Sequence, residues 1–238
     1  MKQRNINEDH EAKAKAKGLG WRIVGSTILH RYPTITPDPL PWEIEYWDLQ
    51  DKIADKKREW IMGEVIGTDA QFFAEENPTI DEIIESMPFK PASRITEADT
   101  KNDRHSLDRH LPNSMYLVVK RNRAANAWQF PQGKVLDTEK SMREAAERVL
   151  DRAGGKFRRW FISNAPIGYY CYEYPEEIQK ARNQYGAKVF FYRAQLIAGS
   201  IKLETKLYKD YAWVTRDELP EYFDENMSEY LQAILPLV

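Results

Sequence analysis

One stretch of the chain, residues 133–155, combines a glycine turn with carboxylates at spacings that could do metal chemistry. Glu139 precedes a predicted helix, and Glu147 and Asp151 lie four residues apart within it, on one face. Hard divalent cations need several oxygen ligands, and a cation held here would neutralise phosphate charge and activate water. However, Arg148 and Arg152 stand among these carboxylates and oppose cation binding. We therefore expect no metal, no cofactor and no catalysis. A solvated ladder of i, i+4 charge pairs is the alternative reading of Glu139, Arg143, Glu147 and Asp151.

The same stretch resembles a Nudix box, whose pattern is G-x5-E-x7-R-E-U-x-E-E-x-G-U, with U a bulky aliphatic residue. Gly133 and Glu139 fit its first two positions. When the chain is aligned to this pattern without a gap, only one of the motif's three helix carboxylate positions holds an acidic residue, Asp151. A one-residue slip places Arg148 on the motif arginine and leaves none, and we prefer it because it also keeps a pair of alanines in register. The resemblance implies a degenerate box made up of Gly133, Glu139, Glu147, Arg148, Asp151 and Arg152.

Charge is distributed unevenly along the chain. The totals of 35 Lys+Arg and 37 Asp+Glu exclude a uniformly basic nucleic-acid binder. Residues 101–160 nevertheless hold 14 basic and 7 acidic side chains. Clustered cations attract phosphate, and guanidinium groups donate in a fork to phosphate oxygens, although a solvated face is the alternative reading. We predict RNA or partner contacts by two groups near loops, namely Lys120, Arg121 and Arg123, and Lys156, Arg158 and Arg159.

Composition and periodicity predict a folded chain of mixed type. Hydrophobic residues make up 42% of the sequence, and no apolar run approaches the ~20 residues of a membrane helix. The first 17 residues lack an apolar stretch and contain acids, so they fit neither a secretory signal nor a typical mitochondrial presequence. We expect strands over 21–29, 115–120, 187–197 and 211–215 and within 157–174, and helices over 42–60, 80–87, 141–152 and 228–235. This order predicts an α/β (α+β) fold with a mixed sheet flanked by helices.

The predicted organisation has three parts. Residues 1–20 form a flexible N-terminal tail, residues 21–112 form an N-terminal extension of a strand, helices and a linker, and residues 113–238 form the main domain. In the extension, Trp42, Tyr46, Leu49 and Ile53 recur at steps of four, three and four. This stripe predicts burial of one helix face against the sheet or a partner.

Several further segments carry a narrower resemblance, and they occur in order with the degenerate box between them. They are residues 32–36 with the helix after them, 130–133, 164–169, 186–191 and the tail 210–219. Together they resemble the family of mitochondrial large ribosomal subunit protein forty-six, whose fold is Nudix-like. The resemblance implies a non-catalytic structural part of that subunit, at its central protuberance in the mitochondrial matrix. Its partners would be other large-subunit proteins and rRNA, with no membrane and no small-molecule substrate. A Nudix-type hydrolase, or a nucleotide-sensing module for nucleoside diphosphate derivatives, stays open as the alternative.

Overall fold

The computed structural model describes residues 2–65, 92–123 and 126–236, with a few further positions between 82 and 89. The chain divides into two compact units, one made of residues 1–35 and 95–238 and the other of residues 36–94. This division differs from the predicted boundaries at 20/21 and 112/113. The difference arises because residues 20–31 and 95–112 pack within the first unit, as described below.

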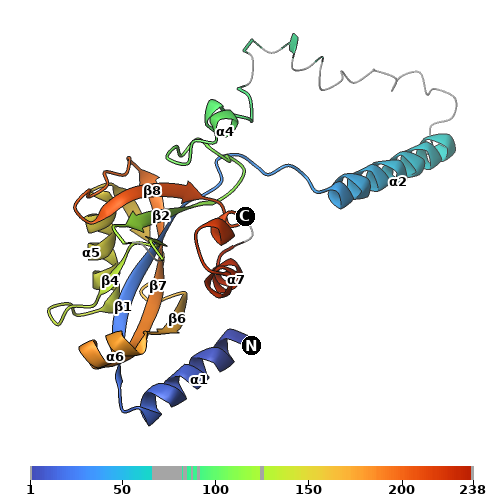
Figure 1. Cartoon of the computed structure of the whole chain (residues 1–238). Helices are drawn as coiled ribbons and strands as arrows, with labels where there is room; N and C mark the ends of the chain where they lie inside the picture. Colours follow the sequence, from blue (N-terminus) through green and yellow to red (C-terminus); the bar gives the residue numbers. More distant parts are fainter. Residues whose placement is uncertain are drawn as a thin grey trace. The chain divides into compact units, whose positions relative to one another are not determined.

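The first unit is built on one mixed sheet (Figure 1). At its centre, β1 (Gly20–Arg31) runs parallel to β7 (Gln184–Ala198), and all other strand pairs are antiparallel. The main path of the sheet is β3-β2-β1-β7-β5, while β4 pairs with β1, β6 with β7 and β8 with β2. The remaining strands are β2 (Met115–Arg121), β3 (Trp128–Gln129), β4 (Gln132–Lys134), β5 (Arg158–Phe161), β6 (Gly168–Glu173) and β8 (Tyr208–Val214).

Each face of the sheet is covered by a helix. Figure 1 shows α5 (Met142–Gly154) on one side and α7 (Glu225–Ile234) on the other. Successive residues of β1 point to opposite faces, so Ile28 joins the cluster beneath α7 and Leu29 joins the cluster beneath α5. Both side chains are fully buried. The sheet flanked by helices confirms the predicted fold class.

Close approach of α5 to the sheet explains several residues of the box-like stretch. A Cβ atom at Gly133 would lie 2.8 Å from Cγ2 of Val149, and one at Gly25 would lie 3.3 Å from Cβ of Ala145. The hydroxyl of Thr27 donates to the carbonyl of Ala146 at 2.8 Å, which ties the strand to the helix. The Ser141 side chain caps the helix by accepting from a backbone N–H of its first turn. The glycine and the small residues therefore have a packing role that requires no metal.

The N-terminal residues differ from the predicted tail. They contain α1 (Lys2–Ala16), on which Ala14 is buried. Nδ1 of His10 lies 3.4 Å from the hydroxyl of Tyr185 in β7, and Lys17 pairs with Glu173 at 3.4 Å. These contacts attach the start of the chain to the first unit. The alternating lysines and alanines of this segment give little sign of the attachment, because few of its side chains are apolar.

The second unit contains α2 (Pro41–Val65), which confirms the predicted helix and extends it. Its apolar stripe is exposed in the structure of this single chain, at 63% for Trp42, 52% for Tyr46, 53% for Leu49 and 39% for Ile53. The helix predicted over 80–87 falls mostly outside the described residues. No helix in the described ranges is long and apolar enough to cross a membrane.

The buried histidine of β1 generates a prediction about acid stability. Both ring nitrogens of His30 lack hydrogen-bond partners among the described residues, and burial, with a smaller contribution from Arg193, lowers its pKa from 6.5 to about 4. The unfolded chain therefore takes up a proton between these values while the folded chain does not, and stability falls as the pH falls from about 6.5 to 4, by about 3 kcal/mol. His30→Phe keeps a ring against Tyr32 and Tyr116 and should flatten this part of the profile of unfolding free energy against pH. His105→Gln changes a half-exposed histidine and should leave the dependence in place; an equal loss in the His30→Phe variant would contradict the assignment.

Candidate functional site

The first candidate is the box-like stretch, in which Glu139 is bound to an arginine. Nε of Arg148 donates to Oε1 of Glu139 at 2.6 Å, and Nη2 of the same arginine donates to the carbonyl of Lys134 at 2.9 Å. The Glu139 carboxylate also accepts the backbone N–H of Leu136 at 2.7 Å. The hydrogen bond from Arg148 is the main cause that lowers the pKa of Glu139 below its usual value. The guanidinium thus takes the place at this carboxylate that a cation would need.

The two helix carboxylates of the stretch are paired as well. Glu147 accepts from Arg143 at 2.8 Å, which is the one i, i+4 pair of the predicted ladder. Asp151 instead pairs with Arg159 of β5 at 2.6 Å, and Glu139 pairs with Arg148 rather than with Arg143. Arg152 lies 3.7 Å from Glu204, outside the box. The solvated ladder is therefore only partly right, because two of its carboxylates are held by arginines from further along the chain.

The first predicted basic group lies at the end of β2 and in the turn after it. Nζ of Lys120 lies 5.5 Å from the ring centroid of Trp128. Arg123 donates to the carbonyl of Asn126 at 2.7 Å and to Oε1 of Gln129 at 3.2 Å. Among the described residues no carboxylate pairs with Lys120, Arg121 or Arg123. Their positive charge is therefore not neutralised within the described part of the chain.

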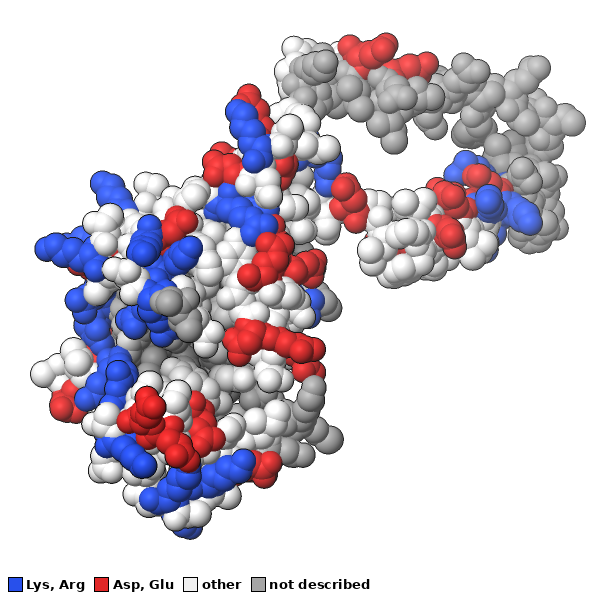
Figure 2. All heavy atoms as spheres, viewed as in Figure 1, with Lys and Arg blue, Asp and Glu red and all other residues white. Residues whose placement is uncertain are grey.

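The second predicted group is held differently. Arg159 is committed to Asp151 and lies over the ring of Phe157, with its side chain 18% exposed, whereas Lys156 and Arg158 are exposed. The strand register also separates the two basic groups. Met115, at the start of β2, lies opposite Arg31 at the end of β1. Arg158, at the start of β5, lies opposite Ala198 of β7, which is beyond the same end of β1. Because β2 runs antiparallel to β1 from that point, its end lies back toward the middle of β1, so the start of β5 and the end of β2 are separated along the strand direction. Figure 2 shows Lys and Arg side chains over the side of the sheet that carries α5, with acidic side chains more prominent near α7.

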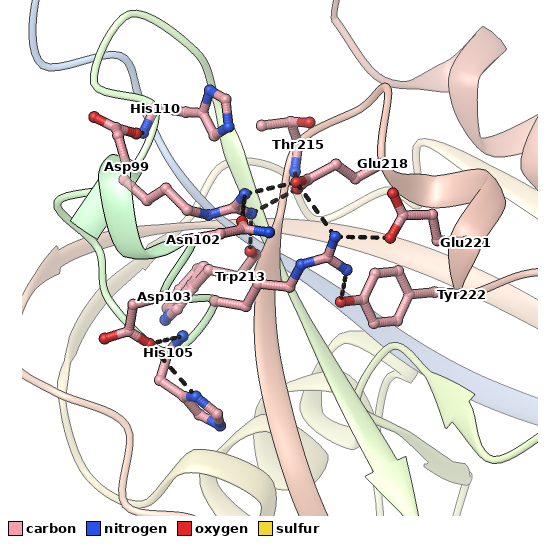
Figure 3. Close-up of polar contacts among 12 residues, drawn as sticks. Asp99, Asn102, Asp103, His105, His110, Trp213, Thr215, Glu218, Glu221 and Tyr222 are labelled. Carbon is pink, nitrogen blue, oxygen red and sulfur yellow. Dashed lines mark hydrogen bonds and ion pairs between the residues drawn. The ribbon is translucent and has the colours of Figure 1, made fainter. Parts of the chain in front are cut away.

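The structure also assembles a cluster that the sequence did not predict, around Arg109 (Figure 3). The Arg109 side chain is 1% exposed and donates to both carboxylate oxygens of Glu218, each at 2.6 Å. It also donates to Oδ1 of Asn102 at 3.0 Å and to the carbonyl of Trp213 at 2.9 Å. Arg104 adds an ion pair with Glu221 at 2.7 Å and a hydrogen bond to the Tyr222 hydroxyl. The arginines thereby join residues 102–109 to β8 and to the short helix η2 (Leu219–Glu221).

The segment predicted as a linker is therefore folded from residue 95 onward. It includes α4 (Glu97–Lys101), whose N-cap Thr96 and Asp99 form a capping box. Arg31, at the end of β1, donates to four carbonyls of this segment. These are the carbonyls of Leu107, Arg109, His110 and Asn113. Buried backbone carbonyls need such donors, so one arginine fixes a loop that has few apolar residues. Prolines and charges led to the linker prediction. The signal that was missed is the pair Arg104 and Arg109, which bind the carboxylates of Glu218 and Glu221.

The Glu218 carboxylate is ionised within this cluster. Burial by itself would raise its pKa, but hydrogen bonds from Arg109 and from the backbone N–H of Thr215 hold the pKa below its usual value. The Thr215 contact is 2.9 Å long. A carboxylate with three donors has no role left as a base, so the cluster is a structural element that positions the C-terminal part of the unit.

A family model and individual relatives of this chain indicate the same protein family. Residues 21–86 match the family described as 39S mitochondrial ribosomal protein L46. A mouse protein named large ribosomal subunit protein mL46 is 30% identical over 232 residues, which cover 89% of this chain and 81% of that protein. A Neurospora crassa protein of the same name is 34% identical over 154 residues, which cover 61% of this chain and 40% of the relative. These relatives are proteins of the mitochondrial large ribosomal subunit. The chain belongs to their family, mL46, which confirms the resemblance found in the sequence and supports a mitochondrial location.

Two solved structures are also similar to this chain. The cocrystal structure of the NUDIX domain of Shewanella oneidensis NrtR complexed with ADP ribose has a TM-score of 0.44 at 10% identity, covering 94% of this chain and 95% of that chain. The Caenorhabditis elegans Ap4A hydrolase binary complex has a TM-score of 0.42 at 15% identity, covering 51% of this chain and 83% of that chain.

The Arg109 cluster generates a prediction about stability. Arg109→Leu leaves the Glu218 carboxylate partly buried without its main partner, so the free energy of unfolding should fall by about 3–5 kcal/mol, measured by urea denaturation. The double variant Arg109→Leu with Glu218→Leu should be less destabilised than the sum of the single variants. Lys101→Met breaks the exposed pair with Glu97 and should cost less than about 1 kcal/mol. Equal effects of Arg109→Leu and Lys101→Met would show that the buried cluster is not the stronger constraint.

Proposed function

We propose that the chain is a non-catalytic structural constituent of the mitochondrial large ribosomal subunit, at its central protuberance, where it contacts other ribosomal proteins and rRNA. The observation that carries the proposal is the similarity to mL46 proteins over most of the chain, combined with a box-like stretch whose carboxylates are bound by arginines. The similarity supports a place in the large ribosomal subunit. The arginine-bound carboxylates are the reason that no metal-dependent reaction is expected.

The absence of catalysis is proposed from charge compensation. Glu139, Glu147 and Asp151 each have an arginine within 2.8 Å, so the segment offers little of the uncompensated negative charge that attracts Mg²⁺. The described residues contain no group of three or more His, Cys, Asp or Glu side chains that could hold a metal ion. A metal-dependent hydrolase would need an additional source of metal ligands.

Protein contacts are proposed for the exposed face of α2. Trp42, Tyr46, Leu49 and Ile53 form one stripe, and Ile44 and Trp47 add apolar surface elsewhere on the helix. Side chains of this size contribute ~1.5–3 kcal/mol each when they become buried. We assign this face to a neighbouring large-subunit protein, because an apolar surface favours a protein neighbour over a phosphate backbone.

The two basic groups receive different proposed partners. Lys120, Arg121 and Arg123 are without carboxylate partners in the described part of the chain and are assigned to rRNA. Lys156 and Arg158, near the start of β5, are assigned to an acidic protein neighbour. Arg159 is removed from the predicted contacts because Asp151 already binds it.

A test of catalysis follows from the paired carboxylates. The purified chain with Mg²⁺ or Mn²⁺ should hydrolyse ADP-ribose, dinucleoside polyphosphates and nucleoside triphosphates no faster than buffer without protein, measured by release of phosphate-containing products. Metal-dependent turnover that disappears in Glu139→Gln and Asp151→Asn variants would instead support the hydrolase alternative.

The assembly itself is tested by sedimentation of mitochondrial ribosomes. The native chain should migrate with the large subunit through a sucrose gradient. Trp42→Ala with Tyr46→Ala should reduce this incorporation without changing the melting temperature of the free chain, because both side chains are already exposed. The matched variant Lys52→Ala with Lys56→Ala changes the same helix at polar positions and should incorporate normally. Unchanged incorporation of the aromatic variant would argue against docking through α2.

A further inference from the structure

Four arginines from separate parts of the first unit line one cavity of about 370 Å³. Arg22 comes from β1, Arg121 and Arg123 from the end of β2 and its turn, and Arg182 from α6 (Glu176–Arg182). The register of the sheet fixes part of the wall, since Arg22, Ala187 and Tyr172 lie in one row across three strands. Part of the cavity wall is therefore formed by the sheet itself, at the end away from Lys156 and Arg158.

These arginines have little internal compensation. In the described ranges no carboxylate forms an ion pair with any of the four. Glu173 is the acidic residue of this cavity, and it is already engaged by Lys17 at 3.4 Å and by the Gln179 amide at 3.0 Å. Like charges held together in this way favour an anion, and guanidinium groups offer it paired donors.

An aromatic compartment adjoins the arginines. Its volume is about 270 Å³, and it shares Arg123, Gln132 and Tyr172 with the first cavity. Its apolar walls come from three strands (β3, β6 and β7), the residue after β3, and α7 with the segment before it. They include Trp128, Phe130, Tyr170, Tyr172 and Phe223. Asp224 and Glu173 are its acidic residues. A flat ring can therefore be enclosed beside a site for phosphate, which is the arrangement that an unpaired nucleotide requires.

We propose that these joined cavities bind an unpaired nucleotide of single-stranded RNA, with its phosphates on Arg22, Arg121 and Arg182 and its base in the aromatic compartment. The inference rests on the proposed ribosomal function and specifies how the first basic group meets RNA. A base inside a duplex is covered by its neighbours and cannot enter, so the site selects unstacked strands. Flanking phosphates of a longer strand add contacts with nearby cations, so a free mononucleotide binds more weakly.

The test uses the full purified chain and a short fluorescein-labelled oligouridylate, with anisotropy measured from low to high salt. Arg22→Ala with Arg182→Ala should weaken binding about tenfold or more. It should also reduce the slope of log affinity against log salt by about 1 to 1.5, because two phosphate contacts at ~0.7 each are lost. Lys156→Ala with Arg158→Ala removes the same charge at the other end of the sheet and should leave affinity and slope unchanged. Melting curves establish that each variant is folded.

A second variant tests the aromatic compartment. Trp128→Leu should weaken binding about fivefold or more while leaving the salt slope unchanged, because stacking carries no net charge. The proposal would be overturned if Arg22→Ala with Arg182→Ala and Lys156→Ala with Arg158→Ala weakened binding equally. It would also be overturned if Trp128→Leu left binding unaffected. Duplex RNA of the same length binding as tightly as the single strand would also overturn it. Competition by uridine monophosphate at the same concentration as the oligonucleotide would identify a free nucleotide as the ligand and reject the RNA assignment.

Sedimentation separates this inference from the proposed function. If the chain migrates with the large subunit but the arginine variant binds the oligouridylate normally, the nucleotide site is wrong and the ribosomal role stands. If the chain binds the oligouridylate through the four arginines but does not migrate with the subunit, the nucleotide site stands and the ribosomal role is wrong.

Discussion

The buried guanidinium of Arg109 is the constraint on which the first unit depends. It neutralises Glu218 in a place with almost no solvent, and in doing so it binds a loop, the end of β8 and the turn before α7 to one point. Removal of Glu218 leaves Arg109 without a charged partner, and removal of Arg109 leaves Glu218 with only the more distant Arg104 at 3.8 Å, so either change weakens the junction of these parts. Because the cluster fixes the end of β8, β8 can pair with β2 as its antiparallel neighbour. The chain after β8 then places α7 over the face of the sheet that carries Ile28 and Phe191.

Periodicity predicted the elements whose apolar residues repeat regularly. The β1, β2, β7 and β8 strands, the α5 helix and the helix after Pro41 all lie where alternation or helical spacing indicated them. The folding of residues 95–113 was missed, because its stability comes from Arg31 and Arg109 binding distant oxygens rather than from apolar residues. The same limit applies to the basic groups. Sequence placed Arg121 and Arg159 in equivalent roles, and only the three-dimensional structure shows that Asp151 neutralises one of them.

Charge in this molecule is divided between two kinds of environment. Around α5, each of three carboxylates has an arginine, so the local field is small although charged residues are dense. Around Arg22 and Arg182, four arginines from three segments meet with one carboxylate that is already engaged. Net charge of −2 for the whole chain hides this contrast. The carboxylates of the box-like stretch are thus neutralised by arginines, while the uncompensated positive charge lies near the start of β1 in the same sheet.

The parallel pair at the centre of the sheet also governs the order in which the molecule can form. Gly20 of β1 lies beside Gln184 of β7, so β1 cannot form its parallel pairing until a strand more than 160 residues later has been synthesised. Until then β1 has open backbone groups and an unburied apolar surface, which makes a partly made chain prone to aggregation. Pairing so distant along the sequence also slows folding, because a long loop must close before any contact compensates for its entropy. A chaperone that covers residues 20–31 during synthesis or translocation would therefore raise the yield of folded protein more than one acting on the C-terminal half.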